Sequence, residues 1–406
     1  SGWGSLGAAF SLMSNKPLAQ ALVVIALLFP PLARAVYAPI PEQDQGKALA
    51  VRLGASIQHD SNIFGSASGE ISSMVYSASA GLAYNGSVTA QTFVSAGYDV
   101  QVDHVRDRPG KQNLANHTLS ARLAHAFSDA TNIDVSDRYL VAKNPQSLLA
   151  GVPLNTDQSF AMNEFNTRFT TATSEKVGLV FKFRHMAMAY ETAALAAQLD
   201  RREDIAGIEA SIKLLPSTKF VGEFRHLDIA YDAAGALKDK RSNFLLVGLD
   251  HNPSEQVTVS ARAGYEDRTR AGADDTSAPY AEVSARYAYA EGSFLSGGYL
   301  YTLEEPSDVV RFTDTSVNRF FVNVQHRLSG LVTASASVSY EPSQLQARTG
   351  FSDLDETVVR TGAAVSWTPN KNWIVSATLD LDRVDSDDAS RGQDRARVGV
   401  AAKFSF

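Results

Sequence analysis

From Ala48 to Phe406 the chain repeats one pattern. Segments of about eight to fourteen residues alternate apolar with polar or small side chains, and breaks rich in Gly, Asn, Asp, Ser or Pro separate them. Successive side chains of a β-strand point to opposite faces, so this period predicts strands with one apolar and one polar side. In the last segment, Val398, Val400 and Phe404 share one side, and Arg395 and Arg397 share the other. The pattern therefore predicts an all-β fold.

Counting the segments gives eighteen predicted strands, near 48–59, 71–84, 87–103, 114–127, 131–142, 160–172, 177–190, 201–214, 218–231, 241–251, 256–268, 278–289, 293–304, 314–328, 331–341, 355–368, 372–384 and 394–406. After even-numbered strands the break is a tight turn: Asn85-Gly86, Ser128-Asp129-Ala130, Ser174-Glu175, Pro216-Ser217, Pro253-Ser254, Glu291-Gly292, Ser329-Gly330 and Pro369-Asn370. After odd-numbered strands the breaks are longer and more polar, as at 143–159, 191–200, 232–240, 269–277, 305–313, 342–354 and 385–393.

The alternation of short and long connections distinguishes a membrane barrel from a soluble β-sandwich. Outer-membrane barrels have an even strand number, short periplasmic turns, long extracellular loops and both termini in the periplasm. Closure is required because backbone groups that face lipid have no water to satisfy them. We therefore expect a transmembrane antiparallel up-and-down β-barrel of about eighteen strands, with aromatic residues such as Tyr84, Phe127 and Trp373 in interfacial girdles.

Composition excludes two other classes. After residue 35 no apolar run reaches the roughly 20 residues of a membrane helix. The net charge is −7 and basic residues are scattered singly, which argues against a nucleic-acid partner. Cysteine is absent, which fits an oxidising compartment but by itself decides little.

The N-terminus reads as a Sec signal peptide. Lys16 supplies a positive region, 18–29 an apolar stretch, and Ala33-Arg34-Ala35 a small-x-small cleavage site. A membrane anchor over 18–32 is the alternative, which its length and Pro30-Pro31 disfavour. We expect residues 1–35 to be an upstream segment and signal peptide, with 1–12 preceding a start at Met13, then 36–47 as a short periplasmic lead and 48–406 as the barrel. From a lead this short we expect no plug domain.

The polar side of the strands is predicted to line the lumen. Its basic residues are Arg122, Arg138, Arg168, Lys182, Arg184, Arg225, Arg262, Arg286, Arg327, Arg360, Arg397 and Lys403, and its acidic residues are Asp134, Glu164, Glu209, Glu223, Glu266, Glu282, Asp380 and Asp382. Two interpretations stay open. The charges form ladders that stiffen a wide wall, or surplus guanidinium groups favour the entry of an anionic solute.

Sites for other chemistry are not recognisable. The eight histidines are dispersed without metal-ligand spacing, and no GxSxG elbow, P-loop or dinucleotide-binding motif is present. We expect no enzyme activity, no cofactor and no metal.

Two short motifs carry a family resemblance. His59-Asp60-Ser61-Asn62-Ile63-Phe64 resembles the opening of β-barrel porins from exopolysaccharide gene clusters, including the exosortase-associated EpsL type, and Asn144-Pro145-Gln146-Ser147 resembles a loop of that group. The resemblance covers the barrel in layout and implies a role in moving or anchoring a secreted polysaccharide. From the residues themselves, Asp60 and Asn62 are turn formers at a strand end, and we assign them no ligand.

These observations lead to three hypotheses of function. The first is an anion-biased outer-membrane channel for a secreted exopolysaccharide in a Gram-negative cell, gated by extracellular loops. The second is a general diffusion porin, and the third is a structural or adhesion barrel with a blocked lumen. The expected partners are outer-membrane lipid, the barrel-assembly machinery, for which Lys403-Phe404-Ser405-Phe406 resembles the recognition signature, an anionic polysaccharide and periplasmic export proteins.

Overall fold

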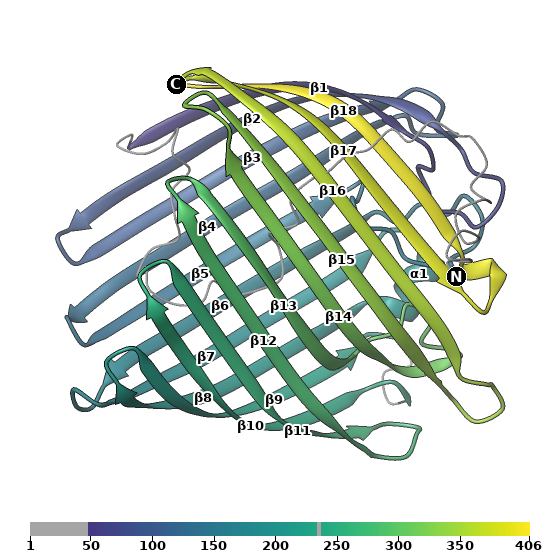
Figure 1. Cartoon of the computed structure of the whole chain (residues 1–406). Coiled ribbons are helices and arrows are strands. Elements are labelled where there is room, and N and C mark those ends of the chain that lie inside the picture. The colour runs from purple at the N-terminus through teal and green to yellow at the C-terminus, as the bar shows by residue number, and fades with distance from the viewer. Residues whose placement is uncertain (1–47, 234–236) are drawn as a thin grey trace, which may run out of the picture.

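The described part of the chain, residues 48–233 and 237–406 of a computed structural model, forms a closed antiparallel barrel (Figure 1). Each strand pairs with its neighbours in the sequence, and β1 closes the ring by pairing with both β2 and β18. The strands are β1 Leu49–Asp60, β2 Ser73–Thr89, β3 Thr92–Val105, β4 Asn113–Ser128, β5 Thr131–Ala142, β6 Phe160–Ala172, β7 Val177–Tyr190, β8 Arg201–Leu215, β9 Thr218–Tyr231, β10 Lys240–Ser254, β11 Val257–Arg270, β12 Thr276–Ala290, β13 Ser293–Glu304, β14 Phe312–Arg327, β15 Val332–Ala347, β16 Leu354–Asn370, β17 Trp373–Ser386 and β18 Gln393–Ser405.

The predicted strand number, topology and alternation of loops are confirmed. Short turns lie at the end of the barrel that holds Phe406, and the long connections lie at the opposite end, called here the loop end (Figure 1). The signal peptide and periplasmic lead, residues 1–47, fall outside the described residues.

The predicted turn at Asn85-Gly86 is wrong. Both residues lie inside β2, where they pair with Ser95 and Val94, and the chain turns at 90–91. A Cβ atom on Gly86 would lie 2.4 Å from the hydroxyl oxygen of Tyr84. The glycine therefore makes room for an aromatic ring against the strand, a role that its turn propensity conceals.

Smaller corrections concern strand ends. Ser254 and Asn370 belong to β10 and β16, so these turns begin about two residues later than predicted. The long connection predicted at 342–354 shrinks to 348–353, because β15 continues to Ala347. The connection 191–200 holds a short helix, α1 (Ala193–Leu199), and a 3-10 turn, η3 (Ala389–Arg391), follows β17. None of the helices among the described residues is long and apolar enough to cross a bilayer.

The two faces of the wall differ as alternation requires. On the outer face, large apolar side chains are exposed, including Leu53, Ile57 and Val400. On the inner face of the same strands, Asp60 and Arg397 are 1% and 5% exposed. The apolar outer face suits lipid, and the charged groups are held inside the barrel.

Candidate functional site

One long connection enters the barrel at the loop end. We call residues 143–159, between β5 and β6, the crossing loop. Asn116 of β4 holds its base, since the side-chain carbonyl of Asn116 accepts hydrogen bonds from the backbone N–H groups of Lys143 and Asn144 at 2.7 and 3.1 Å. Its other end is held by Asp157, which pairs with the buried Arg108 at 2.6 Å. The loop is thus tied at both ends to its own side of the wall.

The first part of the crossing loop reaches β18. Arg395 and Arg397 donate to the backbone carbonyl of Gln146 at 2.8 and 3.1 Å, and Arg397 also donates to the Gln146 side-chain carbonyl. A little further on, the carbonyl of Ala150 accepts from the Ser307 hydroxyl at 3.1 Å. The loop that starts at β5 therefore spans the lumen to β18 and to the connection between β13 and β14.

The two motifs that carry the family resemblance meet at one arginine. Arg395 forks onto the Asp60 carboxylate, with its closest contact at 2.6 Å, while it binds the carbonyl of Gln146. Asn62 forms the expected turn, since its side chain bonds both the N–H and the C=O of Ser66. The turn role predicted for Asp60 and Asn62 is confirmed, and the pairing of Asp60 with Arg395 adds to it.

An apolar cluster lies inside the barrel at the loop end. Its buried members are Leu195 and Leu199 of α1 together with Leu227, Ile229, Tyr231, Phe244, Leu246, Tyr280, Leu300 and Val309. Leu149 and Val152 of the crossing loop pack against them. Apolar packing inside a lumen excludes water, so this side of the loop end is sealed.

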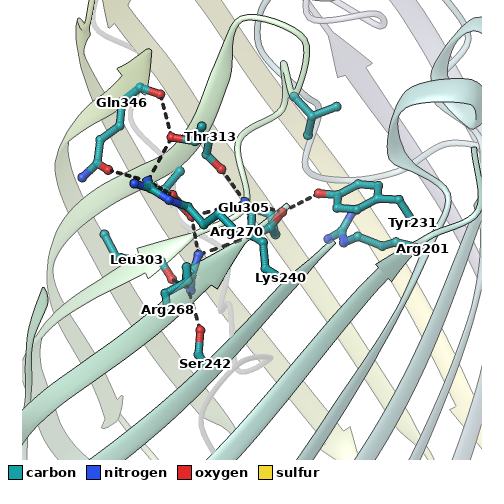
Figure 2. Close-up of polar contacts among 12 residues, drawn as sticks. Arg201, Tyr231, Lys240, Ser242, Arg268, Arg270, Leu303, Glu305, Thr313 and Gln346 are labelled. Carbon is teal, nitrogen blue, oxygen red and sulfur yellow. Dashed lines mark hydrogen bonds and ion pairs between the residues drawn. The ribbon is translucent and has the colours of Figure 1, made fainter. Parts of the chain in front are cut away.

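A charge cluster lies next to the apolar cluster and fixes β14 and the connection before it to β10 and β11 (Figure 2). It consists of Lys240, Glu266, Arg268, Arg270, Glu305 and Asp314. Lys240 contacts Glu305 at 2.7 Å, and Asp314, fully buried, contacts Arg270 at 2.7 Å. Tyr231 donates to Glu305 from the far side. Three cations face three carboxylates, so the cluster is balanced and has no charge left for a ligand.

Two carboxylates in the connections have lowered pKa values. Hydrogen bonds from Ser390 and Arg311 lower the pKa of Asp388 to about 2. Burial raises the pKa of Asp157, but hydrogen bonds from Ser159 and Arg108 outweigh it and hold that pKa below its ordinary value. Both groups are therefore anions at neutral pH and keep their arginine partners.

Most of the predicted lumen cations contact carboxylates. The pairs are Arg122 with Asp134, Lys182 with Glu209 and Glu223, Arg184 with Glu203, Arg225 with Glu223, Arg262 with Asp250, Arg327 with Glu291, Arg360 with Glu341, and Arg397 with Asp380 and Asp382. Glu223 joins Lys182 to Arg225 across β7, β8 and β9. Arginine and acid thus form ladders along the wall.

Four predicted cations differ from the rest. Arg138, Arg168, Arg286 and Lys403 have no ion pair with another described residue. The Arg286 guanidinium lies 3.6 Å from the centroid of the Phe294 ring, and the residue is exposed. Stacking on an aromatic ring holds the group in place and leaves its N–H edges free for an anion.

Sequence reasoning missed the crossing loop as a structural element. Gln146 and Arg395 are 249 residues apart, and neither has a local pattern that announces the contact. The only signal was the resemblance of 144–147 to a known loop. Within residues 48–233 and 237–406, no group of three His, Asp or Glu side chains is arranged to hold a metal ion.

Comparisons with known proteins give structural neighbours only. No protein-family model matches the chain, and no curated protein sequence matches it. The outer membrane protein OpdK of Pseudomonas aeruginosa is similar at 11% identity over 88% of this chain and 99% of that one, with a TM-score of 0.47. OccAB4 of Acinetobacter baumannii has 10% identity, coverages of 89% and 99%, and a TM-score of 0.47. The FrpB iron transporter of Neisseria meningitidis has 10% identity, coverages of 90% and 83%, and a TM-score of 0.45. Similarity at this level defines neither a family nor a ligand.

Proposed function

We propose that this chain is an outer-membrane channel for a secreted exopolysaccharide, with the crossing loop as its gate. A closed barrel with an apolar outer face belongs in lipid, and the strand number allows a wide interior. The observation that carries the proposal is the position of the barrier. It is built from connections at the loop end, whereas the wall between the ends carries exposed or half-buried charges such as Arg138 and Arg286.

The proposed anion bias is modest and rests on few residues. Because most lumen cations are paired with carboxylates, the unpaired cations supply the positive charge that a passing anion would meet, and these are Arg138, Arg168, Arg286 and Lys403. Polysaccharide as the solute is supported by the two motifs, 59–64 and 144–147, which resemble exopolysaccharide porins and both bind Arg395.

The test is conductance and ion selectivity in planar bilayers. We expect the wild-type protein to conduct with a chloride preference, and Arg286→Glu to move the reversal potential toward potassium. Arg383→Glu is the matched control, because Arg383 is 61% exposed and lies on the opposite side of the wall from Asp380 and Asp382. A selectivity that Arg286→Glu leaves unchanged would refute the anion bias.

A second candidate function is a barrel with a blocked lumen whose loops bind a surface polymer. The dense packing of the loop end favours it. The same bilayer experiment decides, because a blocked barrel passes no current either in the wild type or after the crossing loop is shortened.

A further inference from the structure

Four polar side chains point into the lumen beneath the crossing loop. Arg391 of η3 and Gln393, Arg395 and Arg397 of β18 are all at least 94% buried, and we call them the polar ladder. Side chains two residues apart along a strand are about 7 Å apart on the same face. Gln393, Arg395 and Arg397 therefore offer regularly spaced donors and acceptors along β18, and Arg391 adds a further donor from η3.

The arginines of the ladder are already neutralised by the wall. Arg391 contacts Glu356 at 2.8 Å, Arg395 contacts Asp60 at 2.6 Å, and Arg397 contacts Asp382 at 3.0 Å. A fourth carboxylate, Asp380, lies 3.6 Å from Arg397, so the carboxylates outnumber the arginines. An anion would meet this excess of carboxylates, and the ladder is not suited to bind one.

Neutral oxygens accept hydrogen bonds from several other donors of these arginines. The two carbonyl oxygens of Gln146 accept from Arg395 and Arg397, and the Ser307 hydroxyl accepts from Arg391 at 3.0 Å. Amide carbonyls and a hydroxyl of the protein itself thus lie where an uncharged ligand would bind the polar ladder.

The fit of the loop to the ladder is incomplete. Nη1 of Arg391, Nε of Arg397 and Oε1 of Gln393 are buried without a hydrogen-bond partner among the described residues. Buried polar groups without partners are unfavourable, and here both donors and an acceptor are left over. A ligand that satisfies them must carry both donors and acceptors and no charge.

We propose that the polar ladder is a binding site for a neutral sugar chain bearing hydroxyl and acylamino groups, and that Gln146 occupies this site until the sugar displaces it. An acylamino group has the carbonyl that Gln146 supplies and an N–H for Gln393. Displacement frees the crossing loop from β18 while Asn116 and Arg108 hold its ends. This inference rests on the proposed function, because it names the ligand that would open the crossing loop proposed as the gate.

The test measures binding to the full chain in detergent by isothermal titration calorimetry. The probes are an oligomer of N-acetylglucosamine and, for comparison, an oligomer of galacturonic acid. Gln146→Ala removes the competing carbonyl of the side chain and loosens the contact of the loop with β18, so it should bind the N-acetylglucosamine oligomer roughly tenfold more tightly than the wild type does. Adding Gln393→Leu to Gln146→Ala should abolish the gain.

Gln344→Ala is the matched control. Gln344 is exposed on the outer face of β15, where it bonds Asp355 of β16, and its side chain points away from the lumen, so its loss should leave the affinity unchanged. Tighter binding of the galacturonic acid oligomer by Gln146→Ala would overturn the neutral ligand class. If correctly folded variants bind neither probe, the site itself is overturned.

A disulfide gives an independent measurement if Gln146→Ala fails to fold. The chain has no cysteine, so Ala150→Cys with Ser307→Cys places one bridge between two segments already joined by a hydrogen bond of 3.1 Å. We expect sugar binding only after reduction, and equal binding in the oxidised state would overturn displacement. Calorimetry measures binding without any need for current. A barrel that binds the sugar but never conducts would therefore refute the proposed channel and still support sugar binding at the polar ladder.

Discussion

At the scale of single residues, adjacent side chains of a strand point to different surroundings, one toward lipid and the next toward the lumen. Ser56 and Ile57 are adjacent in β1 and pair with Ala401 and Val400 of β18. Ile57 and Val400 are exposed on the outer face, while Ser56 faces the lumen among small polar side chains such as Ser77. The two pairs lie at the same height of the barrel. A difference in the effect of the same substitution at the two pairs therefore reflects only the side of the wall on which each pair lies.

This pairing gives a direct test of the orientation of the wall. Val400→Arg should lower the free energy of unfolding by roughly 2–4 kcal/mol if the residue lies at the bilayer midplane, because the guanidinium would lie in lipid. Ser56→Arg should lower the free energy of unfolding by less than about 1 kcal/mol, since it adds a charge to the lumen side of the wall, which water reaches. Urea titration followed by heat-modifiable gel mobility measures both. Equal losses would mean that the faces are assigned wrongly.

At the scale of elements, the sequence predicted strands far better than connections. Alternation is a local property, so β4, β11 and β18 could be recognised from their own residues. The errors at Asn85-Gly86 and at 342–354 arose because turn-forming residues also occur within strands, where ladder pairing overrides propensity. The fold of the crossing loop depends on contacts with β18 and α1, which no local pattern encodes.

The crossing loop leads to a prediction at this scale. Replacing 146–152 by a short Gly/Ser linker removes the contacts with Arg395, Arg397 and the apolar cluster, so single-channel conductance should rise several-fold. Trimming the exposed segment 350–352 by one residue is the control and should not change conductance. An unchanged conductance after the loop replacement would show that the barrier lies elsewhere.

The contact of η3 with the connection before β14 predicts a response to acid. Arg311 pairs with Asp388 at 2.8 Å, and hydrogen bonds from Ser390 and Arg311 lower the Asp388 pKa to about 2. A lowered pKa means that the stabilising charge is fully present above the ordinary value of 3.8 and is lost as the pH falls toward 2. Channel openings should therefore be insensitive to Asp388 between pH 7 and about pH 4 and rise below about pH 3.

Asp388→Asn separates this group from other acids. The variant should open more often than the wild type at neutral pH, and the two should converge in strong acid. If the variant opens no more often than the wild type at pH 7, the link between η3 and Arg311 does not hold the loop end closed.

At the scale of the whole molecule, the pairing of β1 with β18 both closes the barrel and fixes the register of the last strand. The backbone N–H and C=O of Val51 and Phe406 exchange hydrogen bonds at 2.9 and 3.0 Å, which fixes the register between β1 and β18. Counting outward from that pair, Ser56 and Ala401 form a pair without mutual backbone bonds, where side chains of antiparallel strands come closest. A slip of one residue would turn every side chain of β18 to the other face.

A disulfide between these positions tests closure, register and facing together. Ser56→Cys with Ala401→Cys should oxidise spontaneously, because antiparallel pairs of this kind place Cα atoms about 4.5 Å apart, within the range that a disulfide spans. The chain has no other cysteine, so a single bridge links β1 to β18 and changes the mobility of the heat-denatured protein on a non-reducing gel. Ile57→Cys with Ala401→Cys is the control. Its thiols lie on opposite faces of the wall and should stay reduced, because no rotamer carries a side chain through a hydrogen-bonded sheet. If the control pair oxidised while Ser56→Cys with Ala401→Cys did not, the register would have to be shifted by one residue. Such a shift would exchange the lumen and lipid faces of β18.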